Sequence, residues 1–222
     1  MSADEKSMKY DPAIHHRQSI RLKEYDYSEP GSYFVNICTR KQMCLFGEVE
    51  NAEMKLSPLG KIADACWKEI PKHYPAVMLE SSQIMPNHIH GIITLPELCR
   101  DGACPIPTEH KTRSMKNTLF DVVGSFKSAV TKAVHEAGHF VGRPIWQTRF
   151  YDHIIRDNIS LYFIQQYIEL NPLMWEYSRW NPRGKKISLE QFEGILREKF
   201  GIEGQAAAII MGSEKMFDLG LI

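Results

Sequence analysis

Two histidines separated by a single residue are the clearest candidates for chemistry in this sequence. His88 and His90 lie in the run 88–95, whose β-forming residues predict a strand. Side chains two residues apart on a strand point to the same face, so we expect the two imidazoles to project together while Ile89 packs behind them. They could form half of a metal site, or they could be strand histidines hydrogen-bonded to their neighbours. Gly91 beside the pair leaves room for a ligand backbone or marks a β-bulge.

A tyrosine and an asparagine on a later segment could complete such a site. Tyr167 and Asn171 lie four residues apart in a helix predicted over 158–171, and residues at that spacing share a helix face. The phenol and the carboxamide would therefore point the same way. Pro172 is expected to end this helix, because proline disfavours the helical conformation in the residue before it. Taken without the histidines, Tyr167 would be interpreted as a core aromatic.

These side chains together suit phosphoryl chemistry with a hard divalent cation. Two imidazoles and the Asn171 amide oxygen, with no thiolate, favour Mg²⁺ or Mn²⁺ over structural zinc. The metal would stabilise charge on a scissile phosphate, while Tyr167 would lose its proton as it attacks. Attack on a phosphodiester exchanges one ester for another, so no nucleotide cofactor is required. The sequence indeed contains no GxxxxGK[ST] phosphate loop.

The order of the predicted elements indicates how these residues are positioned. We expect strands at 33–39, 77–85, 88–95 and 146–156, and helices at 58–70, 118–137 and 158–171. The order β-α-β-β-α-β-α is typical of the ferredoxin-like α+β fold, an antiparallel sheet with helices on one face. The chain is expected to comprise an N-terminal arm (1–30), a catalytic domain (31–180) and a C-terminal extension (181–222).

Composition is that of an ordinary globular protein. Hydrophobic residues make up 43% of the 222 and charged residues 24%, which excludes a disordered, collagen-like or coiled-coil chain. No apolar run approaches the ~20 residues of a membrane span, and the polar N-terminus is no signal peptide, so we expect a cytoplasmic protein without membrane contact. Five cysteines without a CxxC pair predict neither disulfides nor a thiolate zinc site. The 27 basic and 27 acidic residues argue against polyanion binding through bulk charge.

Three ordered segments resemble a known family. The HIH triplet at 88–90 and the YIELNP segment at 167–172, preceded by WQTRFYDHIIRD at 146–157, resemble the single-tyrosine HUH transposases, most closely the REP-associated tyrosine transposases. The resemblance covers about residues 25–180. It implies a ferredoxin-like (RRM-like) fold that cuts single-stranded DNA near a hairpin, forms a 5′-phosphotyrosine, releases a 3′-hydroxyl and can rejoin strands. It also implies that His88 and His90 are metal ligands, Tyr167 the nucleophile and Asn171 the third ligand.

Basic and aromatic residues near these segments are candidate DNA contacts. The candidates are Arg113, Lys116, Lys127 and Lys132 for phosphates, Trp146, Gln147 and Arg149 for bases and phosphates, and His153 for a supporting or DNA-contacting role. The alternatives are that the basic residues form a solvated surface, that Trp146 is core, and that His153 is structural. Tyr151, Tyr162 and Tyr177 are rival nucleophiles, but only Tyr167 has a potential ligand one helical turn away.

The sequence therefore predicts a metal-dependent tyrosine transposase that nicks and rejoins single-stranded or hairpin DNA. One alternative is a hairpin-binding module without catalysis. Another is a metal-dependent phosphodiesterase in which water attacks and Tyr167 is structural. A monomer and a homodimer both remain open, because the tyrosine helix could serve its own sheet or that of a partner.

Overall fold

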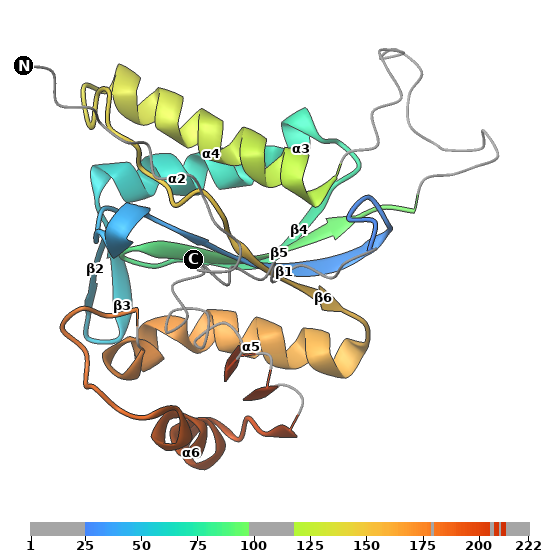
Figure 1. The fold of residues 1–222 in the computed structure, drawn as a ribbon, viewed down its shortest axis with the longest axis vertical. Coiled ribbons are helices and arrows are strands. Elements are labelled where there is room, and N and C mark those ends of the chain that lie inside the picture. The colour runs from blue at the N-terminus through green and yellow to red at the C-terminus, as the bar shows by residue number, and fades with distance from the viewer. Residues whose placement is uncertain (1–24, 98–117, 179, 205–206, 209, 212–222) are drawn as a thin grey trace, which may run out of the picture.

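A four-stranded antiparallel sheet forms the centre of the protein (Figure 1). The computed structural model describes residues 25–97, 118–178, 180–204, 207–208 and 210–211. The strands are β1 (Gly31–Cys38), β4 (Met78–Ile84), β5 (His88–Leu95) and β6 (Tyr151–Ile155), in the spatial order β4-β5-β1-β6. All three neighbouring pairs are antiparallel. The central strands are thus β1 and β5, and β5 carries the histidine pair.

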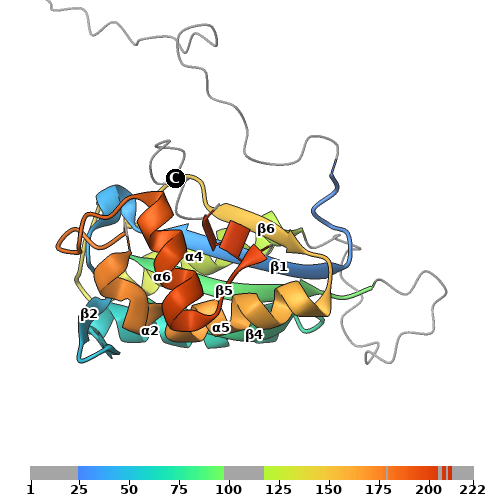
Figure 2. The ribbon, with the colours of Figure 1, turned by 90° about the horizontal axis from the view of Figure 1, so that it is seen from below.

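Helices cover both faces of this sheet, which corrects the prediction of helices on one face only (Figures 1 and 2). On one face pack α2 (Pro58–Lys68) and α4 (Leu119–Glu136), and on the other packs α5 (Asn158–Met174), with α6 (Leu189–Phe200) lying beyond α5 (Figure 1). The reason lies in β1, where successive apolar side chains point to opposite faces. Tyr33 packs in the core with α2 and α4, whereas Phe34 packs in the core with α5 and α6.

The predicted mixture of helices and antiparallel strands is confirmed, and the predicted element order holds along the chain. The sequence did not reveal the small hairpin of β2 (Gly47–Glu50) and β3 (Glu53–Leu56), or the short helix α3 (Ile70–His73). Each hairpin strand has only four residues and alternates between half-buried and exposed side chains. Both residues of its turn, Asn51 and Ala52, have positive φ, and alanine gives little signal for that conformation.

Two predicted boundaries are wrong. The helix α5 does not end before Pro172 but continues to Met174, and a 3-10 turn, η2 (Trp175–Tyr177), follows it directly. Proline costs the helix one N–H donor, and burial of Met174 and Trp175 in the last turn helps to offset that loss. The last strand is also shorter than predicted, because Trp146 forms only an isolated bridge with Thr39 before β6 begins.

The first turn of each major helix is capped as its sequence suggests. Asp157 accepts a hydrogen bond from the Ser160 amide and so fixes the start of α5. Thr118 and Asp121 form a reciprocal capping box at the start of α4. Within the described residues, no helix combines the length and apolar character needed to cross a membrane.

Candidate active site

The two histidines of β5 point to the same face of the sheet, as predicted. Both side chains are fully buried, and their Nε2 atoms lie 2.9 Å apart. The other ring nitrogen of His88, Nδ1, lies 2.8 Å from Oδ1 of Asn87. The Nδ1 atom of His90 has no hydrogen-bond partner among the described residues. The pair therefore presents two nitrogen atoms to one point.

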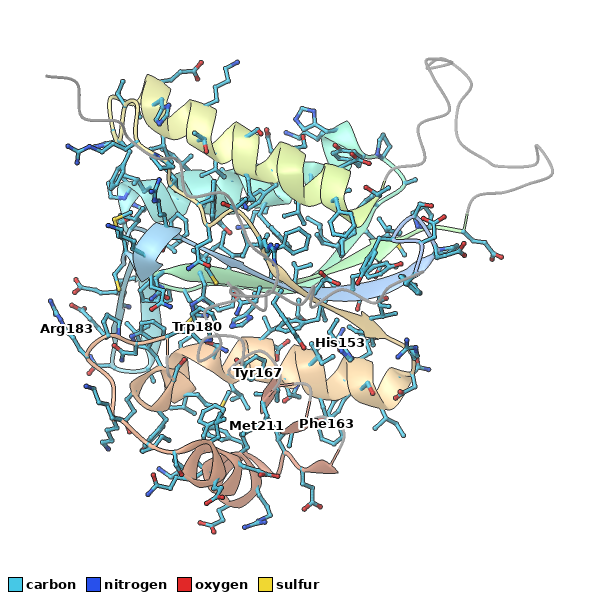
Figure 3. All side chains as sticks on the ribbon, viewed as in Figure 1. His153, Phe163, Tyr167, Trp180, Arg183 and Met211 are labelled. Atoms are coloured by element: carbon cyan, nitrogen blue, oxygen red, sulfur yellow. The ribbon has the colours of Figure 1, made fainter. Side chains whose placement is uncertain are left out.

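The helix α5 brings Tyr167 and Asn171 to this same face. The rings of Tyr167 and His90 are 5.2 Å apart between centroids and inclined by 68°. Tyr167 is 2% exposed and Asn171 3%. Figure 3 labels Tyr167 on α5, below the sheet. Because one chain supplies both the tyrosine and the histidines, a partner's helix is not required to bring them together.

Apolar surroundings keep both histidines neutral. Burial lowers the pKa of His88 well below its usual value, and the neighbouring His90 lowers it further. Burial likewise lowers the pKa of His90, to about 3. A neutral imidazole has a free lone pair on one nitrogen, which is the form that binds metal ions. The electrostatics of the site thus favour ligation by these histidines over a role as cationic phosphate contacts.

The spacing of the histidine nitrogens fits a shared metal ion. Two nitrogens that each lie about 2.1 Å from one ion at right angles would be about 3.0 Å apart. The observed separation is 2.9 Å. Among the described residues, no group of three or more His, Cys, Asp or Glu side chains could hold a metal. Of the residues that the structure describes, the buried carboxamide of Asn171 on the same face is the candidate for a third ligand.

Two tryptophans that the sequence interpretation did not use close the site. The ring of Trp175 lies 5.9 Å from that of His88, and the ring of Trp180 lies 5.5 Å from it. Phe34 stacks on His90 at 5.4 Å with an interplanar angle of 13°. These rings contribute to the complete burial of the imidazoles. In this structure the two imidazoles are therefore closed off from solvent.

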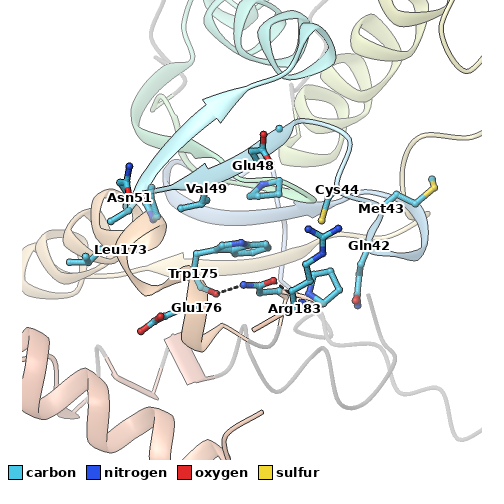
Figure 4. Close-up of a pocket in the computed structure, with 16 residues that line it drawn as sticks. Gln42, Met43, Cys44, Glu48, Val49, Asn51, Leu173, Trp175, Glu176 and Arg183 are labelled. Atoms are coloured by element: carbon cyan, nitrogen blue, oxygen red, sulfur yellow. Dashed lines mark hydrogen bonds between the residues drawn. The ribbon is translucent and has the colours of Figure 1, made fainter. Parts of the chain in front are cut away.

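An open cavity of about 1020 Å³ has Trp175 in its lining (Figure 4). The β2–β3 hairpin contributes Val49 to its lining, and the segment after α5 contributes Trp175 and Arg183. Trp175 thus contributes to the lining of this cavity and also contacts His88.

His153 lies on the histidine side of the sheet. In the register of β1 and β6 it pairs with Phe34, and paired residues of antiparallel strands point to the same face. Figure 3 labels it near β6. It is half-buried, and its pKa is lowered by burial and by Arg156. No described contact joins it to the histidine pair.

Gly91 does not provide room for a ligand, which corrects one of the two interpretations of this residue. A Cβ atom at this position would lie 2.3 Å from the Trp67 ring, on the face covered by α2. The glycine therefore admits a tryptophan of the core. A glycine is needed at this position, but for packing between helix and sheet and not for binding a ligand.

Several candidate DNA contacts belong to the opposite face of the sheet. The Lys127 ammonium donates to the Gln147 carbonyl at 2.6 Å, and burial lowers its pKa to about 8. Trp146 is buried in the core with α2 and α4, so the alternative that it is a core residue is confirmed. Gln147 is half-buried beside it. None of these three residues is brought to the histidines.

The remaining candidates are exposed or lie outside the described residues. Arg149 is exposed, and Lys132 is exposed with its ammonium 3.8 Å from Glu136. Arg113 and Lys116 fall outside the described residues.

Two relatives of the chain come from Haemophilus influenzae. An uncharacterised protein is 40% identical over 173 residues, which cover 76% of this chain and 94% of that protein. The chain belongs to the same family as this protein. A second relative, named "Putative REP-associated tyrosine transposase", is 26% identical over 152 residues, which cover 68% of this chain and 76% of that protein. The resemblance to REP-associated tyrosine transposases predicted from the sequence is thereby confirmed.

Solved structures show a more distant likeness. A REP-associated tyrosine transposase bound to a REP hairpin has a TM-score of 0.45 and 20% identity, covering 70% of this chain and 73% of that chain. A "putative transposase" from Deinococcus radiodurans has a TM-score of 0.37 and 16% identity, covering 68% of this chain and 96% of that chain. No model of a protein family matches the chain.

Proposed function

We propose that this protein is a metal-dependent tyrosine transposase that nicks and rejoins single-stranded DNA beside a hairpin. The observation that carries the proposal is the convergence, within one chain, of the two Nε2 atoms of His88 and His90 with the ring of Tyr167. The similarity to a relative named as a tyrosine transposase supports the same chemistry. Hairpin DNA as the substrate follows from the resemblance of the three sequence segments to that family.

In this proposal Tyr167 is the nucleophile. Its phenolic oxygen attacks the phosphorus of a backbone phosphodiester and gives up its proton, and the bond to the 3′ oxygen breaks. The 3′ oxygen takes up a proton and leaves as a hydroxyl, while the 5′ phosphate stays on the tyrosine. Rejoining is the reverse reaction with a 3′-hydroxyl of another strand. Because one ester replaces another, neither direction needs an external energy source.

The histidines would act on the phosphate through a bound metal ion. Mg²⁺ or Mn²⁺ held by His88, His90 and Asn171 would supply Lewis-acid stabilisation of the charge that develops on the phosphate. Burial keeps the imidazoles neutral and available as ligands. The Phe34 ring stacked on His90 would exclude water from that side of the site, which favours attack by the phenol over hydrolysis.

The direct test is the formation of a covalent protein–DNA adduct. The full chain is incubated with Mn²⁺ and a single-stranded oligonucleotide that contains a hairpin, and the products are separated on a denaturing gel. We expect an adduct that Tyr167→Phe abolishes. Tyr162→Phe is the matched control, because Tyr162 lies on the same helix but is exposed. Cleavage without an adduct would favour attack by water, and binding alone would favour a non-catalytic module.

The histidines are tested separately from DNA binding. We expect His88→Ala and His90→Ala to abolish cleavage and leave hairpin binding largely intact, because both side chains are buried away from the protein surface. Binding is measured by fluorescence anisotropy with the same oligonucleotide. An equal loss of binding and cleavage would contradict a purely catalytic role.

A further inference from the structure

We propose that Asn87 is a positioning residue that holds His88 in the tautomer whose Nε2 lone pair faces His90. The inference rests on the proposed function, because the lone pair matters through its ligation of a metal ion. Asn87 lies in the turn between β4 and β5, directly before the histidine strand, and is fully buried. It touches neither the proposed nucleophile nor the phosphate, so its effect would pass through His88.

The orientation of the Asn87 carboxamide is fixed by two main-chain carbonyls. Its Nδ2 donates to the oxygen of Trp180 at 2.6 Å and to the oxygen of Gln42 at 3.2 Å. Carbonyl oxygens only accept hydrogen bonds, so the amino group must face them. The opposite rotamer would place Oδ1 against two other oxygens. The Asn87 Oδ1 atom therefore faces His88.

This orientation determines which nitrogen of His88 carries the proton. The Asn87 Oδ1 atom, 2.8 Å from Nδ1 of His88, can only accept, so Nδ1 must donate. A neutral imidazole has a single N–H, and Nε2 of His88 is consequently unprotonated. Its lone pair points to the place where Nε2 of His90 lies 2.9 Å away. Hydrogen bonds from the second ring nitrogen are a general means of orienting histidine ligands.

The two histidines therefore differ in how firmly their tautomers are fixed. Without a metal ion, Nε2–H of His90 can donate to Nε2 of His88. Ligation by both Nε2 atoms requires the His90 proton to move to its own Nδ1. That atom has no hydrogen-bond partner among the described residues, so nothing there holds His90 in one tautomer. His88 is thus already in the tautomer that binds a metal ion through Nε2, whereas His90 must change its tautomer to do so.

The main chain of the turn is anchored independently of the Asn87 side chain. The carbonyl of Asn87 accepts from the Thr39 amide at 2.9 Å and lies 3.0 Å from the Thr39 hydroxyl. The neighbouring Pro86 carbonyl accepts from the Phe46 amide at 3.0 Å. Loss of the carboxamide should therefore release the imidazole while the turn itself is retained. Thr39 provides a matched control, since it contacts the same turn but not the ring.

The experiment measures tautomer and metal affinity in the full chain. Histidine nitrogen NMR of the metal-free protein should show His88 with a protonated Nδ1 and an unprotonated Nε2, assigned by comparison with His88→Gln. In Asn87→Ala we expect a population with protonated Nε2. Titration calorimetry should then show weaker Mn²⁺ binding than in the wild type, by about 10–100-fold.

Controls separate this effect from a loss of folding. Thr39→Val should leave both the His88 tautomer and Mn²⁺ affinity unchanged, and thermal unfolding is recorded for every variant. A wild-type His88 protonated at Nε2 overturns the inference even if no Asn87 variant folds. An unaltered tautomer and unaltered affinity in folded Asn87→Ala would also overturn it. If the wild type shows the expected tautomer but no Mn²⁺ binding, the metal-dependent function fails while the tautomer assignment stands.

Discussion

The rings of His90 and Tyr167 contact each other across the boundary between β5 and α5, at 5.2 Å between centroids. The two residues are 77 positions apart in the sequence, and one belongs to the sheet while the other belongs to the helix that covers it. The contact places the proposed nucleophile beside a proposed metal ligand within a single chain.

Protonation of the buried histidines should make stability depend on pH. An unfolded histidine titrates near 6.5, whereas burial lowers the pKa of His90 in the folded protein to about 3 and that of His88 well below 6.5. Between these values the unfolded chain binds more protons. The stability present above about pH 6.5 should therefore be lost as the pH falls, by up to ~1.4 kcal/mol per pH unit for each histidine.

Urea unfolding of the metal-free protein at about pH 7 and about pH 5 measures this dependence. His90→Gln removes one of the two groups and should show a shallower loss between these pH values. Equal free energies of unfolding at both pH values in the wild type would show that the histidines are not buried as neutral groups.

Gly91→Ala should destabilise the fold without altering any proposed ligand. The added Cβ would lie 2.3 Å from the Trp67 ring, which is itself packed in the core. Overpacking of this kind typically costs ~1–3 kcal/mol. Gly124→Ala is the matched control, because no atom lies within 4 Å of its added Cβ and it lies on the exposed side of α4.

Chemical denaturation gives the free energy of unfolding of both glycine variants. The control should be neutral or more stable than the wild type, since alanine is the better helix former by ~1 kcal/mol. A Gly91→Ala variant as stable as the wild type would contradict the close packing of Trp67 on β5.

The closed state of the site can be tested by chemical labelling. Diethyl pyrocarbonate should modify exposed His73 quickly and buried His88 slowly in the free protein. Trp180→Ala removes a ring that covers His88 at 5.5 Å, so labelling of His88 should accelerate while that of His73 stays constant. Mass spectrometry of the peptides gives both rates from one sample. Equal labelling of the two histidines in the wild type would mean that the tryptophans do not close the site.

The histidine side of the site could be predicted from the sequence because it depends on local geometry. The alternation of a strand places His88 and His90 on one face, and the spacing of a helix places Tyr167 and Asn171 together. That these two faces meet followed only from the resemblance of the segments, since no local rule joins a strand to a helix so far along the chain.

Other parts of the site depend on tertiary contacts and were missed or misassigned. Trp180 covers His88 after a helix that passes through Pro172, where the sequence predicted its end. Lys127 occupies a position that the helix pattern marks as exposed, but its ammonium contacts the carbonyl of Gln147, 20 residues later. Such contacts depend on how distant segments fold together, and neither periodicity nor charge predicts them.

The proposed function requires that Tyr167 become covalently joined to DNA. After reaction of the full chain with a hairpin oligonucleotide and Mn²⁺, the protein is digested and its peptides are analysed by mass spectrometry. We expect a peptide containing Tyr167 that carries the 5′ phosphate of the cleaved strand, lost in Tyr167→Phe and retained in Tyr162→Phe. Cleaved DNA with no modified tyrosine peptide, or a modification on another tyrosine, would contradict it.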